Sequence, residues 1–370
     1  RDRGTGPGIR YHSVYSLWRD CLSVSSVLKG GFPLAQRLGR YTLKMEHMPS
    51  VQGYAAVCGK KEGDGPLGKH FDFVYEDTTL GESSWEKAES RLQTDAVNRA
   101  LQKAGVTSSD IDYIFAGDLL NQCISSTFGL RSLSIPFLGQ YGACSTMAQT
   151  LAMSAILVET GAARRCVAVT SSHFCSAERQ FRFPLEYGGQ RTPTAQWTVT
   201  GSGAAVVGNT GNSPYISAVT VGRITDLGIK DANNMGAAMA PAAYSTLTDF
   251  LKDTETSPRD YDLIVTGDLG EVGSELLKEL LQKDGIDISK NHADCGLLIY
   301  DREKQDVHAG GSGCGCAGSI LCSYLLNRLK SGELKNILFM ATGALMSPTS
   351  SQQGESIPGI AHLIHFKSSL

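Results

Sequence analysis

The chain has 370 residues, of which 41% are hydrophobic, and a formal net charge of −3. This length predicts two domains or one large pseudo-symmetric domain, and the near-neutral charge gives no support for nucleic acid as a partner. Ten cysteines occur without a Cys-x-x-Cys pair, which is typical of free thiols in a reducing compartment rather than of a zinc site or a disulfide scaffold.

Residues 1–40 differ in composition from the rest of the chain. They are rich in Arg, Ser and Gly, and Asp2 and Asp20 are their acidic residues. Such a segment fits a transit-type presequence, a surface-binding arm or sequence upstream of the true start. We favour the last, with Met45 or Met48 as a later start, and expect little order here. No apolar run approaches the ~18 residues that span a bilayer, so we expect a soluble chain that can still sit on a membrane.

The first elements after residue 40 are predicted from local patterns. Residues 41–73 are expected to hold a short strand followed by a glycine-rich loop. Ser83–Glu86 resembles a capping box, and apolar residues then recur on one helical face up to Lys103. Gly105 ends this helix. Ile111–Leu119 is predicted to be a strand that runs into a loop.

The segment 135–161 is the most informative stretch. An apolar run leads into Gly142-Ala143-Cys144-Ser145-Thr146, and helical spacing follows until Gly161. Cys144 is therefore predicted at a strand-to-helix corner, at or within the first turn of a mostly buried helix. The free N–H groups and the dipole at a helix start favour a thiolate or a bound anion. The alternative is that Cys144 is one more buried small side chain.

The following segments alternate between strands and loops. Residues 166–170 are predicted to be a buried strand that ends at Ser171, Ser172 and His173, and residues 178–190 are predicted to be a polar, aromatic loop. Further strands are expected at residues 200–207, after a glycine turn, and at residues 216–224. This alternation of strands with helices predicts an α/β fold with a substantially parallel sheet.

The second half of the chain repeats the pattern of the first half. Residues 262–269 match residues 112–119, and the glycine-rich stretch 310–319 opens a helix much as residues 142–146 do. Residues 336–342 then mirror the strand at 166–170. Matches in the same order indicate an internal duplication. The two helix starts are expected to face each other at one site, because ligands of open α/β sheets bind at such strand-to-helix ends.

The predicted organisation is an N-terminal extension at residues 1–40, a first half at 41–220 and a second half at 221–370. The duplicated unit, the cysteine at a buried helix start and the two glycine-rich turns together resemble the thiolase superfamily, which includes thiolases and β-ketoacyl-acyl-carrier-protein synthases. The resemblance implies thiolase-like duplicated α/β halves, with mixed, largely parallel sheets around a buried helix pair.

A closer similarity is to the stage V AD family of sporulation proteins of endospore-forming bacteria, from about residue 41 to the end. Several long blocks in the same order carry it: Asp64–Gly68, Ala116–Gln122, Tyr141–Thr146, Ser171–His173, Ala177–Arg182, Thr198–Gly203, Met239–Ala243 and Asp294–Tyr300.

This similarity implies a protein that binds dipicolinic acid or calcium dipicolinate and helps to load the developing spore with it. It also implies other stage V sporulation membrane proteins as partners, and a place in the forespore or spore, peripheral to the inner membrane, without forming a channel. The resemblance also implies a homodimer, as an alternative to a monomer, because superfamily members commonly dimerise through the sheet of the first half. We expect no cofactor and no protein-bound metal.

Catalysis of the superfamily's condensing type requires more than Cys144. A His or Asn from the second half must hold the thioester oxygen and assist proton transfer. By the internal match, these partners are expected near residues 266–270 and 311–314, and neither stretch contains His or Asn. Asp268 would be a poor oxyanion partner, whereas Cys314 or Cys316 would be a second thiol. We therefore predict no enzyme, with acyl-thioester condensation or acyl transfer by Cys144 as the alternative.

A binding site for a flat pyridine dicarboxylate requires backbone N–H donors, hydroxyls or cations and small or apolar walls. Besides a binding protein and an enzyme, a third interpretation of the chain is a mainly structural assembly partner whose pocket is vestigial. The predicted ligand-binding residues combine the helix start, the polar residues after it and the second glycine turn: Cys144, Ser145, Ser172, His173, Arg179, Arg182, Gln190, Ser312 and Gly313.

Overall fold

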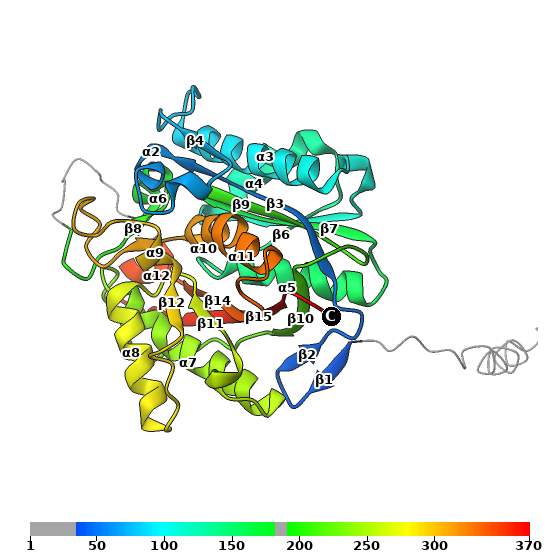
Figure 1. Ribbon diagram of the computed structural model, residues 1–370. Coiled ribbons are helices and arrows are strands. Elements are labelled where there is room, and N and C mark those ends of the chain that lie inside the picture. The colour runs from blue at the N-terminus through cyan, green and yellow to red at the C-terminus, as the bar shows by residue number, and fades with distance from the viewer. Residues whose placement is uncertain (1–34, 182–190) are drawn as a thin grey trace, which may run out of the picture. The chain divides into compact units, whose positions relative to one another are not determined.

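The computed structural model describes residues 35–181 and 191–370 (Figure 1). Its strands form one 13-stranded mixed sheet and one two-stranded sheet. The strands of the large sheet are β1 (Gln36–Leu38), β2 (Thr42–Lys44), β3 (Ser50–Gly59), β4 (Phe73–Tyr75), β5 (Tyr113–Gly117), β6 (Phe137–Gly139), β7 (Arg165–Ser172), β9 (Gly201–Gly208), β10 (Tyr215–Thr220), β11 (Leu263–Thr266), β12 (His292–Asp294), β14 (Asn336–Ala344) and β15 (Gly359–Lys367).

The two-stranded sheet pairs β8 (Trp197–Thr198) with β13 (Gly311–Ser312) in parallel. The helices are α2 (Lys60–Gly63), α3 (Trp85–Ala104), α4 (Ile124–Leu130), α5 (Thr146–Glu159), α6 (Phe174–Phe181), α7 (Met235–Thr254), α8 (Gly270–Lys283), α9 (Cys295–Leu298), α10 (Cys314–Ile320), α11 (Leu326–Lys330) and α12 (Pro348–Gln352). Of the helices in residues 35–181 and 191–370, none is long and apolar enough to cross a membrane.

The large sheet contains the same strand pattern twice. Its main order is β12-β11-β14-β15-β10-β3-β9-β7-β5-β6. On one side β3, β9 and β7 are antiparallel neighbours and β7, β5 and β6 are parallel. On the other side β10, β15 and β14 are antiparallel and β14, β11 and β12 are parallel. The predicted duplication is therefore present in the strand order, whereas the boundary at residue 220 stays a prediction.

The matched segments before β5 and β11 also make the same contacts. Asp112 Oδ2 accepts hydrogen bonds from the backbone N–H groups of Arg164 and Arg165 at the start of β7. Asp262 Oδ2 accepts them from Lys335 and Asn336 at the start of β14. A repeated aspartate thus ties together the beginnings of two neighbouring parallel strands in each half.

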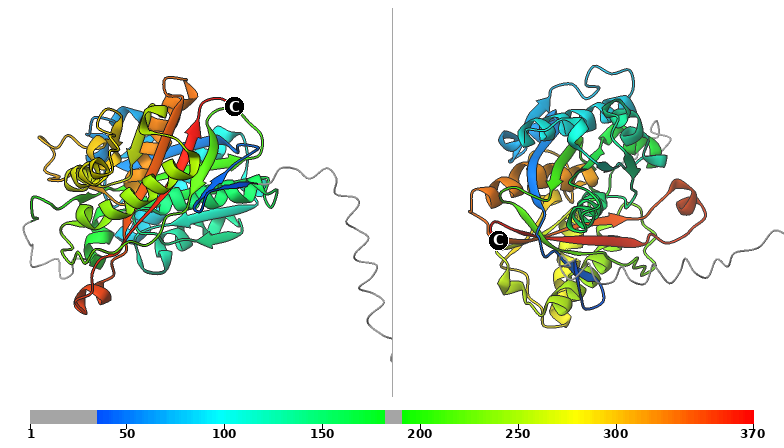
Figure 2. Two further views of the ribbon diagram at one scale, coloured as in Figure 1. Left: turned by 90° about the horizontal axis from the view of Figure 1, so that it is seen from below. Right: turned by 90° about the vertical axis from the view of Figure 1, so that its right-hand side faces the viewer.

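Helices α5 and α10 form the middle layer, between the strands of the two halves (Figures 1 and 2). α5 contacts β5, β7 and β9 on one side and β14 and β15 on the other. The two helices share one hydrophobic core, in which Met147, Leu151, Ala317 and Ile320 are fully buried. Helix α3 covers the outer face of the first half and α7 that of the second. A buried helix pair between two duplicated halves matches the expected fold class.

The local predictions were correct for most elements and wrong for three. The helix predicted to run to Lys103 is α3, which Ser84 caps by accepting a hydrogen bond from Lys87 N–H. Residues 41–73 hold the short strand β2 and also a ten-residue buried strand, β3, which was not expected. The strand expected at 216–224 ends at Thr220. Residues 178–181 continue α6, whereas residues 182–190 of the expected loop lie outside the described residues.

Helix α6 is bound to α3 by polar side-chain contacts. Ser176 Oγ donates a hydrogen bond of 2.7 Å to Glu89 Oε2, and Arg179 pairs with Glu86 and lies over the Trp85 ring. These contacts join residues about 90 positions apart in the sequence. No pattern within residues 178–190 reveals them.

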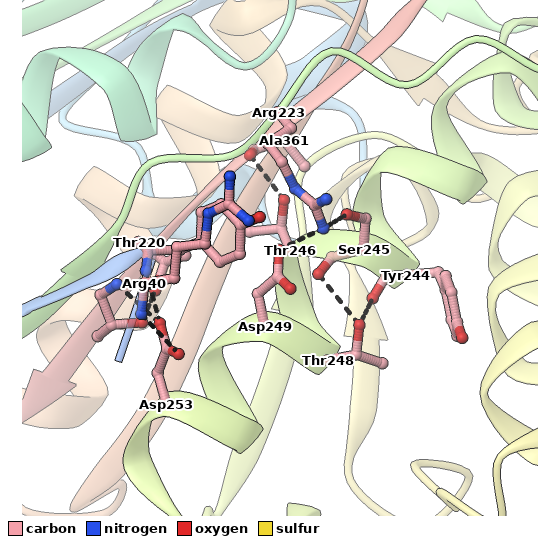
Figure 3. A network of polar contacts seen from close by, with 12 residues as sticks. Arg40, Thr220, Arg223, Tyr244, Ser245, Thr246, Thr248, Asp249, Asp253 and Ala361 are labelled. Atoms are coloured by element: carbon pink, nitrogen blue, oxygen red, sulfur yellow. Dashed lines mark hydrogen bonds and ion pairs between the residues drawn. The ribbon is translucent and has the colours of Figure 1, made fainter. Parts of the chain in front are cut away.

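The first described strands are fastened to α7 by one carboxylate (Figure 3). Asp253 of α7 accepts hydrogen bonds from the backbone N–H groups of Arg40, Tyr41 and Thr42 at 3.1, 2.8 and 2.9 Å. Although partial burial raises the pKa of Asp253, these bonds lower it more, so that it lies below its usual value. Nearby on the same helix, Asp249 binds the Arg223 side chain at 2.7 Å.

Asp253→Ala is expected to lower the free energy of unfolding by about 1–3 kcal/mol, because three backbone donors lose their acceptor. Asp249→Ala, which removes a partly exposed ion pair, is the matched control and should cost about 1 kcal/mol or less. Equilibrium denaturant unfolding measures both values, and hydrogen exchange should rise at residues 36–44 in the first variant alone. Equal effects of the two substitutions would contradict this role of Asp253.

Candidate functional site

Cys144 lies in a tight turn between β6 and α5. Ser145 N–H and Ser145 Oγ both donate to Gly142 O, at 3.0 and 2.7 Å, and Ala143 has a φ of 49°. α5 begins at Thr146, so that Cys144 precedes the helix by two residues and is not within its first turn. The turn forms because hydroxyl groups of Ser145 and Thr146 satisfy the carbonyls of Gly142 and Ala143. Cys144 is 6% exposed.

Two segments of the second half meet this turn, as the internal match predicted. Asp268, which follows β11, is fully buried and lies beside the Cys144 thiol. Its Oδ2 accepts a 2.8 Å hydrogen bond from Gly313 N–H, and its Oδ1 accepts one of 2.9 Å from Thr342 Oγ1. Gly313 has a φ of 105°, which only glycine adopts easily. The carboxylate therefore connects three segments around one cysteine.

Burial controls the protonation of this pair. It raises the pKa of Asp268 to about 7, against the opposing effect of its hydrogen bonds to Cys144, Gly313 and Thr342. Burial, and next the negative charge of Asp268, raises the pKa of the Cys144 thiol well above its ordinary value. Cys144 is therefore a neutral thiol at pH 7, although it lies close to a helix start.

The other two candidate thiols, those of Cys314 and Cys316, lie against backbone carbonyl oxygens. Cys314 Sγ lies 2.9 Å from Ser171 O and is fully buried. Cys316 Sγ lies 3.8 Å from Gly267 O. Burial raises the pKa of both thiols well above the ordinary value. Cys314 packs against Cys144 in one small cluster with Leu119 and Ala177.

A narrow pocket opens at Cys144. Its empty volume, with the open space at its mouth included, is about 620 Å³. Apolar side chains and a few hydroxyl and amide groups line it: Leu119, Tyr141, Ala143, Cys144, Ala177, Glu178, Phe181, Gln196, Thr198, Ala232, Asn233, Met235, Ser312, Ala344 and Met346. The walls come from both halves of the chain.

The structure brings together some of the predicted ligand-binding residues and not others. Cys144 and Ser312 line the pocket, and Gly313 lies behind it with its N–H bound to Asp268. Ser145 Oγ is bound to Gly142 O. Ser172 Oγ donates to Val199 O and accepts from Gly315 N–H. The polar atoms of Ser145 and Ser172 are therefore used by the fold.

His173 and Arg179 lie away from the described walls of the pocket. His173 Nδ1 accepts a hydrogen bond from Cys175 N–H, so that Nε2 carries the proton and donates to Thr78 O at 2.8 Å. Burial lowers the pKa of His173, which keeps it neutral. Arg179 is half-exposed and paired with Glu86. Arg182 and Gln190 lie outside the described residues.

Sequence reasoning missed the residues that complete the walls. Gln196 and Thr198 precede the glycine turn of β9, and Met346 follows β14. One of the family-like sequence blocks begins at Thr198, and Gln196 lies two residues before it. This position next to the block was the signal that could have pointed to Gln196. Met346 had no signal, because its place depends on how the loop after β14 packs against α6 and Tyr141.

Comparison with known proteins defines the class first and then the family. The structure is similar to 3-oxoacyl-[acyl-carrier-protein] synthase III from Aquifex aeolicus, with a TM-score of 0.54 and 15% identity over 86% of this chain and 99% of that chain. It is also similar to cerulenin-bound OleA from Xanthomonas campestris, with a TM-score of 0.56 and 11% identity over 86% of this chain and 98% of that chain. The fold is therefore thiolase-like, as predicted.

The family is defined by sequence. Residues 39–367 match the family model of stage V sporulation protein AD. The chain is also 49% identical to stage V sporulation protein AD of Bacillus subtilis (strain 168) over 329 residues, which cover 89% of this chain and 97% of that protein. The chain belongs to the stage V sporulation protein AD family.

Thiol labelling tests the protonation of Cys144. Cys175 is the partly exposed cysteine among the nine described free cysteines, and the other eight are buried. Iodoacetamide at pH 8 is expected to label Cys175 first and Cys144 slowly, because the thiolate is the nucleophile and each pKa unit lowers its population about ten-fold. Asp268→Asn should speed the labelling of Cys144, since a negative neighbour is removed. Peptide mass mapping over time measures the order, and first labelling of Cys144 would contradict the neutral thiol.

Proposed function

We propose that this protein binds dipicolinic acid, or its calcium chelate, in the pocket at Cys144 and serves its uptake into the developing spore without catalysis. The observation that carries the proposal is the pairing of a neutral, buried thiol with a buried carboxylate, Asp268, in a narrow pocket of a stage V sporulation protein AD family member. The link to dipicolinate comes from the family resemblance.

The electrostatics of the site weigh against acyl transfer. A thioester reaction needs a thiolate and donors that stabilise the developing oxyanion. The Asp268 carboxylate is an acceptor, and it raises the pKa of the thiol. Gly313 N–H, which could have served as a donor, is bound to Asp268 Oδ2. Reversible binding requires neither a thiolate nor an oxyanion donor.

The lining of the pocket suits a small aromatic ligand. Leu119, Phe181 and Met346 provide apolar side chains, and Ser312, Thr198 and Asn233 provide polar groups. An aromatic acid of one ring suits such a lining.

Titration calorimetry with dipicolinate, in the presence and absence of calcium, tests the binding. Wild-type protein should give saturable heat with one site per chain. Ala177→Leu should abolish the heat of binding, because Ala177 lines the pocket and the larger side chain would fill the space that the ligand needs. Cys175→Ala is the matched control, since Cys175 lies on the same helix and is not among the pocket's lining residues. Unchanged binding in Ala177→Leu would place the ligand elsewhere, and absence of heat in the wild type would refute the proposal.

The second candidate is an acyl-thioester condensing or acyl-transfer enzyme that uses Cys144. The similarity of the fold to solved condensing enzymes favours it. Incubation with an acyl-CoA separates the two functions: a mass increase on Cys144 that is lost in Cys144→Ala would support the enzyme. An unmodified chain that binds dipicolinate would support the binder.

The cellular setting is part of the proposal. A stage V sporulation family member is expected in the forespore or spore, at the inner membrane as a peripheral protein, beside other stage V membrane proteins. Family membership supports the sporulation role. Co-purification from sporulating cells in low and high salt would distinguish attachment to membrane proteins from a freely diffusing protein.

A homodimer is also proposed, through the end of the sheet at β6. β6 ends the main strand order, and its three residues are all exposed. Phe137 and Leu138 on this strand, and Ile124 and Phe128 on α4, are exposed apolar side chains. An exposed edge strand offers unpaired N–H and C=O groups for pairing with a second strand. Antiparallel pairing of two β6 strands would join the sheets of two copies about a twofold axis.

Leu138→Asp is expected to turn such a dimer into a monomer, because a charge would be buried at the paired edge. Leu227→Asp is the control: Leu227 is 68% exposed, compared with 46% for Leu138, and lies outside the sheet. Sedimentation velocity measures the mass of each variant. A monomeric wild type, or an equal response of both variants, would exclude this interface.

A further inference from the structure

We infer that Gln196 selects the form of the ligand, by accepting a hydrogen bond that the ligand must donate into the pocket. Applied to the proposed function, on which this inference rests, it means that a pyridine dicarboxylic acid binds with a proton on one carboxyl group and not as the bare dianion. The observation behind it is that Gln196 lines the Cys144 pocket and that its amide oxygen is buried without a hydrogen-bond partner.

The orientation of the Gln196 amide is fixed by its nitrogen. Nε2 donates to Asp268 O and to Gly311 O, both at 2.8 Å. Exchange of the nitrogen and the oxygen would place Oε1 against two carbonyl oxygens, which is repulsive. The side chain lies just before β8, whose pairing with β13 positions Gly311. The amide oxygen is therefore the polar atom that the backbone does not use.

This oxygen is buried without a donor. Gln196 is 7% exposed, and its Oε1 accepts no hydrogen bond from any residue in the described part of the chain. A buried acceptor without a partner costs about 1–3 kcal/mol, and native structures rarely leave one unpaired. Since Gln196 lines the pocket, a ligand that donates a hydrogen bond to Oε1 recovers this cost.

The charges around the pocket also favour a ligand that donates a hydrogen bond. None of the described residues that line the pocket is Lys or Arg. Asp268 lies behind Cys144, and the thiols of Cys144 and Cys314 and the phenol of Tyr141 are neutral because their pKa values are raised. A bare pyridine dicarboxylate has hydrogen-bond acceptors and no O–H donor. It would therefore bring negative charge close to the Gln196 amide oxygen and the Asp268 carboxylate. The singly protonated acid carries less charge and supplies the O–H donor.

The monoamide of dipicolinic acid tests this directly, because its carboxamide supplies an N–H donor at any pH. Calorimetry at pH 8 in calcium-free buffer should show that the monoamide binds the wild type about ten-fold more tightly than dipicolinate does. The preference should vanish in Gln196→Met and persist in Gln149→Met. Gln149 also has an unpartnered buried oxygen, and it does not line this pocket. Equal affinities in the wild type, or a preference that survives Gln196→Met, would overturn the inference.

A second measurement needs no variant. Titrations in buffers with different heats of ionisation count protons, and dipicolinate should take up about one proton on binding at pH 8, whereas the monoamide takes up fewer. Equal uptake of protons by both ligands would overturn the inference.

If neither pyridine acid binds, titrations with benzamide and benzoate test the donor requirement separately from the proposed binding of dipicolinate. Binding of benzamide but not benzoate, lost in Gln196→Met, would support the donor requirement and refute dipicolinate. Binding of both alike, or of neither at the limit of solubility, would overturn the donor requirement as well.

Discussion

The close approach of two helices to the strands that flank them is the constraint on which the rest of the structure depends. A Cβ atom on Gly203 would lie 2.1 Å from Gly318 O, and one on Gly343 would lie 2.3 Å from Gly142 O. Both distances are impossible, so a larger residue would push α10 away from β9, or the turn before α5 away from β14. Because glycine stands at these positions, α10 packs directly on β9, and the turn before α5 packs directly on β14.

The chemistry of the site follows from the burial of the Cys144 turn. A helix start near the surface would lower the pKa of a nearby thiol, whereas burial of the Cys144 turn raises it. The charge of ionised Asp268 beside the thiol raises this pKa further. A cysteine close to a helix start is therefore not made reactive by that position alone, because burial and a neighbouring carboxylate both act against the thiolate.

Much of this arrangement could be predicted from the sequence, because it is encoded locally. The repeated aspartates before β5 and β11, the Cys144 corner and the glycine turn before Cys314 are all visible as short patterns, and the structure places the two turns at one site. The parts that could not be predicted depend on contacts between distant segments. β3 has few residues that favour strands and is stabilised by its neighbours on both sides. The free oxygen of Gln196 becomes apparent only when Asp268 O and Gly311 O are seen to bind its nitrogen.

The wall of the pocket formed by α6 depends on a buried acid in the same way. Glu89 is 1% exposed, accepts hydrogen bonds from Ser171 and Ser176, and has its pKa raised to about 8 by burial and then by the charge of Asp118. In the unfolded chain the group ionises near its ordinary value, so the folded state binds more protons between the two pKa values. Stability therefore falls as the pH rises through this window. Since Ser176 stands next to Ala177, which lines the pocket, the hydrogen bond from Ser176 to Glu89 connects this wall of the pocket to α3.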